Sequence, residues 1–115
     1  MLFLEYPKCS TCQKAKKWLD EHQISYEDRH IVENNPTFEE LKDWYGRSGL
    51  PLKKFFNTSG MLYKEMKLKD KLPEMSEEEQ LKLLATNGML VKRPLIVDGD
   101  RVLTGFKMAE WEALL

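Results

Sequence analysis

Residues 1–21, MLFLEYPKCSTCQKAKKWLDE, decide the fold of this chain. Residues 1–6 are a compact run of mainly apolar and aromatic side chains that a proline ends, which predicts a short buried strand. Residues 10–21 repeat apolar side chains at the helical period, which predicts a helix with one buried face. That face consists of Ala15, Trp18, Leu19 and His22. A strand therefore leads directly into a helix, with two cysteines at the junction.

A second strand is predicted over residues 23–29, because Ile24, Tyr26 and Asp28 lie at alternate positions. A strand, a helix and a strand within about 30 residues are typical of a right-handed βαβ unit with parallel strands. The start of the chain therefore predicts a sheet with a helix packed on it.

The middle of the chain predicts further helices. Thr37-Phe38-Glu39-Glu40 and Ser76-Glu77-Glu78-Glu79 both have the capping-box pattern, a hydroxyl residue followed three positions later by a glutamate. Asn87-Gly88 is typical of a helix end. We therefore expect a helical insertion over about residues 36–90.

The end of the chain predicts a hairpin and a last helix. Leu95-Ile96-Val97 and residues 101–104 have strand character, and Asp98-Gly99-Asp100 between them is a strong turn signal. The apolar residues of the last helix are Met108, Trp111, Leu114 and Leu115. The expected fold class is α/β: a βαβ…ββα mixed sheet with a helical insertion, in a single domain over residues 1–115.

The amino-acid composition and the charge balance restrict the kinds of function that this chain can have. The chain has 115 residues, of which 42% are hydrophobic and 32% charged, as in ordinary globular proteins. Its 18 Lys and Arg against 19 Asp and Glu give no overall positive field for nucleic acid or anionic lipid. The longest apolar runs are too short for a membrane span, and Glu5 and Lys8 interrupt any signal-peptide core. We therefore expect a cytoplasmic protein without direct nucleic-acid or membrane binding.

Cys9 and Cys12 are the two cysteines, and they form one C-x-x-C motif. A helix N-terminus stabilises a thiolate through its free N–H groups and its dipole, and Lys8 and Lys14 add positive charge nearby. We therefore expect a lowered pKa for Cys9, which makes it a nucleophile at neutral pH. Cys12 lies one turn further along, near enough to attack a mixed disulfide formed at Cys9.

Two other interpretations of these cysteines stay open. One is a pair of inert thiols that happen to be neighbours. The other is a zinc site completed by His22 and His30, although their spacing from the cysteines differs from that of the usual zinc fingers. Cysteine pairs in a reducing compartment are more often catalytic, redox-sensing or metal-binding than structural. We expect no bound metal.

Arg93-Pro94 is the second informative feature, because it directly precedes a predicted buried strand. A proline at that place indicates a special bend, for which a cis peptide bond is one form. Arg93 adds a planar and permanently charged group. The element order places Pro94 opposite the cysteine loop. The alternative is an ordinary loop arginine before a proline that starts a strand.

Other conspicuous residues favour structural interpretations. The basic run is interrupted by acidic residues, which is typical of a solvated helix face. The three tryptophans lie on amphipathic patterns, which predicts that they belong to the core. The basic run consists of Lys64, Lys67, Lys69 and Lys71, and the tryptophans are Trp18, Trp44 and Trp111.

Four segments of the chain, in this order, resemble the arsenate reductase ArsC/Spx/MgsR family. They are Tyr6-Pro7-Lys8-Cys9-Ser10-Thr11-Cys12-Gln13-Lys14-Ala15, Phe56-Asn57-Thr58-Ser59-Gly60, Lys92-Arg93-Pro94-Leu95-Ile96-Val97 and Thr104-Gly105-Phe106. The resemblance runs from about residue 2 to the end. It implies a thioredoxin-like (glutaredoxin-like) fold with a helical insertion.

The resemblance also implies roles for individual residues. In the glutaredoxin-coupled arsenate reductases of this family the first cysteine attacks the oxyanion, which corresponds to Cys9, and an arginine before the proline holds the anion, which corresponds to Arg93. Two further arginines of those enzymes would fall near Phe56-Asn57, where this chain has no arginine, and near Thr104-Gly105, where it has glycine and where Arg101 lies nearby toward the hairpin turn. Candidate substrate-binding residues are Lys8, Ser10, Thr11 and Pro94.

Two functions follow from this resemblance. The first is an oxidoreductase, either an arsenate reductase or a glutaredoxin-like thiol–disulfide oxidoreductase. It would have no bound cofactor and would use glutathione with glutaredoxin, or thioredoxin, as electron donor. The second is an Spx-like redox-sensing transcriptional regulator that binds the RNA polymerase α C-terminal domain. Such regulators normally carry a charged C-terminal extension, whereas this chain ends at Leu114-Leu115.

Overall fold

The computed structural model describes residues 1–115 and contains one four-stranded mixed sheet. The strand order is β2-β1-β3-β4, with β1 parallel to β2, β1 antiparallel to β3, and β3 antiparallel to β4. The strands are β1 (Leu2–Glu5), β2 (Glu27–His30), β3 (Leu95–Asp98) and β4 (Arg101–Thr104). The predicted α/β class, the parallel βαβ unit and the hairpin are therefore confirmed.

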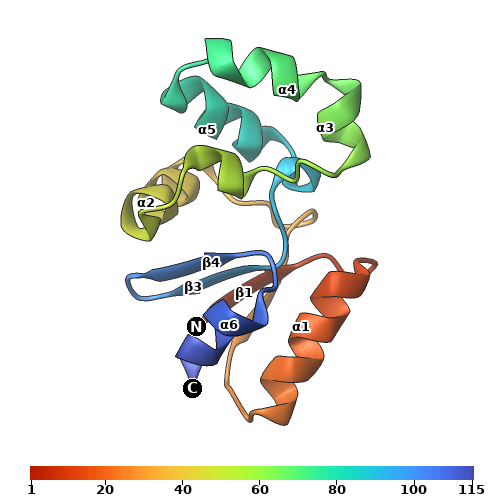
Figure 1. Ribbon diagram of the computed structural model, residues 1–115, viewed down its shortest axis with the longest axis vertical. Coiled ribbons are helices and arrows are strands. Elements are labelled where there is room, and N and C mark those ends of the chain that lie inside the picture. The colour runs from red at the N-terminus through yellow and green to blue at the C-terminus, as the bar shows by residue number, and fades with distance from the viewer.

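Helices lie on both faces of this sheet (Figure 1). One face carries α1 and α6, and the other carries the helices that the chain forms between β2 and β3. The α-helices are α1 (Ser10–Glu21), α2 (Phe38–Ser48), α3 (Met61–Glu65), α4 (Leu68–Lys71), α5 (Glu77–Thr86) and α6 (Met108–Trp111). Short 3-10 turns are η1 (Leu52–Phe55), η2 (Leu72–Glu74), η3 (Gly88–Leu90) and η4 (Glu112–Leu114).

Alternation along the strands divides the core into two clusters. In β1, Leu4 packs into the cluster on the side of α2 to α5, whereas Phe3 packs under α1 and α6. In β3, Leu95 and Ile96 divide in the same way. The tryptophans are buried as predicted, and the basic run is exposed as predicted. These residues are Trp18, Trp44 and Trp111, and Lys64, Lys67, Lys69 and Lys71.

The second strand begins later than its alternation predicts. Gln23 has a φ of 56° and donates its N–H to the Asp20 carbonyl, so the chain is still leaving α1 there. Pairing with β1 begins only where the Glu27 N–H donates to the carbonyl of Met1. The prediction of a strand from residue 23 was therefore wrong at its start, because strand bounds depend on the partner strand and not on alternation alone.

Both predicted capping boxes are present. The Thr37 hydroxyl accepts from the Glu40 N–H at 3.1 Å, and the Glu40 carboxylate accepts from the Thr37 N–H at 3.0 Å. Ser76 and Glu79 make the same reciprocal pair at the start of α5. Each box satisfies N–H groups that the first turn of a helix leaves free.

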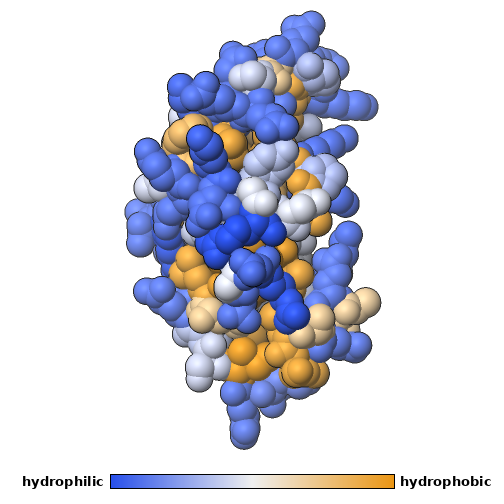
Figure 2. Space-filling model, turned by 90° about the vertical axis from the view of Figure 1, so that its left-hand side faces the viewer, coloured by the Kyte–Doolittle hydropathy of each residue, from blue (hydrophilic) through white to orange (hydrophobic).

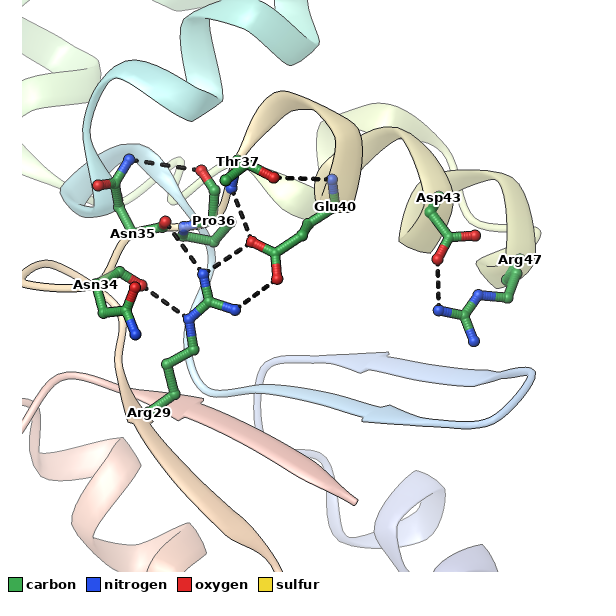
Figure 3. Close-up of polar contacts among 8 residues, drawn as sticks. All are labelled: Arg29, Asn34, Asn35, Pro36, Thr37, Glu40, Asp43 and Arg47. Carbon is green, nitrogen blue, oxygen red and sulfur yellow. Dashed lines mark hydrogen bonds and ion pairs between the residues drawn. The ribbon is translucent and has the colours of Figure 1, made fainter.

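Arg29 of β2 also binds the capping box of α2 (Figure 3). The guanidinium binds both carboxylate oxygens of Glu40, at 2.7 and 2.8 Å, and donates to the carbonyls of Asn34 and Asn35. Only 13% of the Arg29 side chain is exposed. The hydrogen bonds of Arg29 lower the pKa of Glu40 to about 2. This ion pair therefore attaches the first helix of the insertion to the edge of the sheet.

We expect Glu40→Gln to reduce the free energy of unfolding at pH 7 by about 2 kcal/mol, because it leaves Arg29 without its charged partner. A carboxyl with a lowered pKa in the folded protein contributes stability above its unfolded pKa of 4.5, and that contribution is lost as the pH falls toward about 2. Urea unfolding at pH 7 and pH 2.5 measures both effects.

The matched control is Asp43→Asn, which removes a carboxylate from an exposed ion pair with Arg47 on the same helix. Exposed pairs of this kind contribute less than about 0.5 kcal/mol. Equal losses in the two variants, or a Glu40→Gln loss that persists undiminished at pH 2.5, would contradict the prediction.

The surface carries no extended hydrophobic region on the side shown in Figure 2, where hydrophobic residues form small patches among hydrophilic ones. None of the helices has the length and apolar character that crossing a membrane requires.

Candidate active site

The C-x-x-C motif lies where β1 leads into α1. Cys9 is the N-cap residue of α1 in an extended conformation, and Cys12 is in the first turn. The loop before them is closed by two hydrogen bonds, from the Cys9 N–H to the Tyr6 carbonyl and from the Gln13 amide to the Pro7 carbonyl. Both cysteines are free thiols; Cys9 is partly exposed and Cys12 is fully buried. The motif therefore presents one sulfur to solvent and keeps the other inside.

Burial of the Cys9 thiol disfavours its charged form, but several neighbours act in the opposite direction. The backbone N–H and the thiol of Cys12 hydrogen-bond to the sulfur, and Arg93 contributes a positive charge. Together with the Thr11 N–H these groups outweigh burial, so the pKa of Cys9 is lowered. This direction is the one expected for a nucleophilic cysteine at a helix start.

Cys12 has the opposite behaviour. Burial raises the pKa of its thiol, and the hydrogen bond and charge of Cys9 raise it further, to about 12. Two thiols one turn apart therefore differ in protonation: Cys9 ionises first and Cys12 keeps its proton. The negative charge of Cys9 is one reason that Cys12 keeps it, and that cause disappears once Cys9 is bonded to another sulfur.

Arg93 reaches the cysteines from the segment before β3. Its guanidinium lies 5.3 Å from the centre of the Tyr6 ring, and its Nη1 donates to the Met89 carbonyl at 3.3 Å. Its Nε is buried without a hydrogen-bond partner. The Tyr6 ring and the Met89 carbonyl hold the Arg93 guanidinium at the end of the sheet where Cys9 lies. The sequence predicted Tyr6 as the end of the strand and as part of the first segment of the family resemblance, but not its contact with Arg93.

Pro94 is buried, and the Arg93–Pro94 peptide bond is cis. The Pro94 carbonyl accepts the Gly105 N–H at 2.8 Å, which joins the end of β4 to the start of β3. The Lys92 N–H donates to the Phe55 carbonyl, and the Asn57 N–H donates to the Leu90 carbonyl. The segments that carry the family resemblance therefore lie close together around the Arg93–Pro94 bond.

The other candidate residues lie at the surface of the same loop. Lys8, Ser10 and Thr11 are exposed, and Thr11 contributes its backbone N–H to the Cys9 sulfur. The positive charge that lowers the pKa of Cys9 is that of Arg93, whereas Lys14 is exposed on α1. The expected contribution of Lys8 and Lys14 was therefore wrong, because neither lysine is among the groups that act on Cys9 and the positive charge comes from a residue distant in sequence.

The two histidines make hydrogen bonds with backbone groups and not with the cysteines. His30 accepts backbone N–H groups of Val32 and Glu33 on Nδ1, and His22 pairs with the Trp18 carbonyl at the end of α1. No three His, Cys, Asp or Glu side chains come together in a way that could hold a metal ion. The zinc interpretation of the C-x-x-C motif therefore has no ligand set.

We expect Arg93→Met to raise the pKa of Cys9 toward its ordinary value, because the substitution removes the positive charge and keeps an apolar side chain over Tyr6. The rate of Cys9 alkylation by iodoacetamide, followed against pH, measures this shift. Arg101→Met is the control, since Arg101 donates to the Ala113 carbonyl and is not among the groups that act on Cys9. An unchanged midpoint in Arg93→Met would contradict the prediction.

The sequence profile of the ArsC family matches residues 4–114. A solved structure of an ArsC-family-related protein from Bacteroides fragilis is 68% identical, covers 99% of this chain and 96% of its own, and superimposes with a TM-score of 0.96. A structure described as a possible arsenate reductase from Streptococcus mutans is 44% identical, with 99% and 97% covered and a TM-score of 0.91. The regulatory protein MgsR of Bacillus subtilis is 33% identical, with 96% of this chain and 86% of MgsR covered.

Proposed function

Because this chain belongs to the ArsC family, we propose that it is a thiol–disulfide oxidoreductase in which Cys9 attacks and Cys12 resolves. One observation carries the proposal: the pKa of the partly exposed Cys9 is lowered while that of the buried Cys12 is raised to about 12. A sulfur that ionises more readily and that substrates can reach, beside a sulfur that keeps its proton and that substrates cannot reach, divides the two roles.

The Cys9 thiolate attacks one sulfur of a substrate disulfide, the substrate S–S bond breaks, and the departing thiolate takes up a proton. Cys12 then loses its proton and attacks the Cys9 sulfur, which releases the second substrate thiol and leaves a Cys9–Cys12 disulfide. The substrate gains two electrons and the protein loses two, and a thiol reductant restores the dithiol.

Arg93 has a second role in this proposal. A guanidinium with an unpaired buried Nε, whose charge lowers the pKa of the attacking sulfur, stabilises negative charge on that sulfur and on the thiolate that departs. Pro94, Lys8, Ser10 and Thr11 form the surroundings that a substrate would contact.

The test compares wild-type protein with Cys9→Ser in two assays. Turnover of a small disulfide with glutathione and glutaredoxin, or with thioredoxin, tests the oxidoreductase; turnover of arsenate with the same donors tests the specific activity named for the Streptococcus mutans relative. Disulfide turnover that requires Cys9 supports the proposal. A protein that reduces neither substrate with either donor would refute it.

The similarity to MgsR favours a second candidate, a redox-sensing regulator in which the same cysteine pair is the sensor. Oxidation to a Cys9–Cys12 disulfide would replace the charge on Cys9 by a neutral bond. The test is a pull-down with the RNA polymerase α C-terminal domain, carried out with reduced and oxidised protein. Binding that differs between the two forms supports the regulator, and the absence of binding in both forms refutes it.

A further inference from the structure

A groove of about 690 Å³ lies along the outer edge of β4. Val102, Leu103 and Thr104 all line it. Consecutive residues of a strand point to opposite faces of a sheet, so a groove that touches all three runs along the edge of the strand rather than over one face. β4 is the last strand of the sheet and has a strand partner only on the β3 side.

The backbone at this edge has no hydrogen-bond partner on its outer side, and Val102 and Thr104 are 5% and 8% exposed. Strand β4 pairs with β3 in antiparallel register, and in such a pair alternate residues turn both N–H and C=O away from the partner. No hydrogen bond from elsewhere in the molecule reaches the backbone of residues 101–104 from the outer side. The edge therefore has donors and acceptors available for one more strand.

Both walls of the groove are positively charged. Lys53 and Lys54 lie in η1, on the side of the sheet that carries the helical insertion. Lys107 directly precedes α6, which lies on the opposite side of the sheet (Figure 1). Lys92 also lines the groove, and its Cε lies 3.1 Å from the position of a Cβ on Gly105. We call this site the lysine groove: Lys53, Lys54, Lys92, Lys107 and residues 102–104.

These charges have no counterparts within the chain. None of the four lysines takes part in an ion pair or donates a side-chain hydrogen bond, and Glu110 is the one acidic residue of the groove lining. Lysine side chains on both walls and a free strand edge at the base together match an anionic ligand with an extended backbone.

We propose that the lysine groove binds an extended acidic segment of a partner protein, which adds to the sheet as a strand next to β4. Four residues of β4 span about 13 Å, long enough to pair with a short strand. Adjacent residues of the added strand point to opposite walls, so two neighbouring acidic residues reach Lys53 and Lys54 on one side and Lys107 on the other. A small anion would use the lysines but not the backbone edge.

The test measures fluorescence anisotropy of a labelled peptide that contains two adjacent glutamates flanked by valine and threonine. We expect saturable binding that weakens with salt, and at least about tenfold weaker binding to the triple variant Lys53→Glu, Lys54→Glu, Lys107→Glu. The triple variant Lys64→Glu, Lys67→Glu, Lys71→Glu, with the same charge change on exposed residues outside the groove, is expected to bind within about twofold of wild type.

Two further arms separate strand addition from simple charge attraction. A peptide in which proline replaces both the valine and the threonine loses an N–H that faces the edge, because these two positions point in opposite directions along a strand, and it is expected to bind much more weakly. Amide shifts in residues 102–104 are expected with the first peptide only. Equal binding of both peptides, or full displacement by inorganic phosphate, would identify an anion site and overturn the proposal.

Neither cysteine lines the lysine groove. Cys9→Ser is expected to bind the peptide as wild type does, so failure of peptide binding and failure of thiol chemistry are separate results. No detectable binding of the glutamate peptide by wild-type protein, or equal losses in the two lysine variants, would also overturn it.

Discussion

Cys9→Ser is expected to abolish disulfide reduction, with turnover reduced by at least about a thousandfold, because a serine hydroxyl does not ionise at neutral pH and cannot form a mixed disulfide. Cys12→Ser is expected to behave differently. It keeps the attacking thiolate but lacks the group that releases the substrate, so it should accumulate a stable mixed disulfide at Cys9. Mass spectrometry of protein mixed with a small disulfide distinguishes the two variants.

The pH dependence provides a second readout of the same chemistry. Formation of the mixed disulfide should reach its full rate at a lower pH than with an ordinary cysteine, because the pKa of Cys9 is lowered. Its resolution should become faster as the pH rises, because burial keeps Cys12 protonated even after the charge on Cys9 has been removed. Mixed-disulfide formation at Cys12 in the Cys9→Ser variant, at a rate similar to wild type, would contradict the assignment of roles.

Gly88→Ala is expected to have the largest effect on stability, a loss of about 3 kcal/mol in the free energy of unfolding. Gly88 lies in η3, where the chain returns from the helical insertion and passes over the end of β2. A Cβ there would lie 2.7 Å from the carbonyl carbon of Ile31, nearer still to its oxygen, and 2.9 Å from the Cα of Val32. These are backbone atoms, so neither a rotamer change nor a flexible side chain can relieve the contact.

The matched control is Gly46→Ala, because Gly46 lies in α2 and a Cβ at that position meets no atom within 4 Å. Alanine is the better helix former, so this variant is expected to gain about 0.5 to 1 kcal/mol. Thermal unfolding followed by circular dichroism should show a Tm lowered by more than about 10 °C for Gly88→Ala and slightly raised for Gly46→Ala. Similar Tm values for the two variants would show that the backbone contact at Gly88 is not tight.

The sequence around Gly88 predicted the end of a helix but not the close contact of Gly88 with the end of β2. Asn87-Gly88 was predicted to end a helix, and α5 does end at Thr86. The close approach to the end of β2 could not be predicted, because Ile31 is distant in sequence and the contact exists only once the insertion has folded back over the sheet.

Local patterns determined much of the fold because their causes are local. A helix period, a capping box or a turn depends on residues within about four positions of one another, and the boxes at Thr37 and Ser76 formed as predicted. The start of β2 differed from the prediction because the extent of a strand depends on its pairing with a neighbouring strand. The alternating residues before Glu27 do not pair with β1.

By itself the sequence determined the order of elements, the mixed α/β class and the placement of Cys9 and Cys12 at the start of a helix, since all of these follow from neighbouring residues. Tertiary structure alone decided what surrounds the sulfurs: the burial of Cys12, the charge of Arg93 near Cys9 and the Tyr6 ring against that charge. The reason is that desolvation and electrostatic interactions depend on distance in space, and β3 brings Arg93 next to β1 only through the sheet.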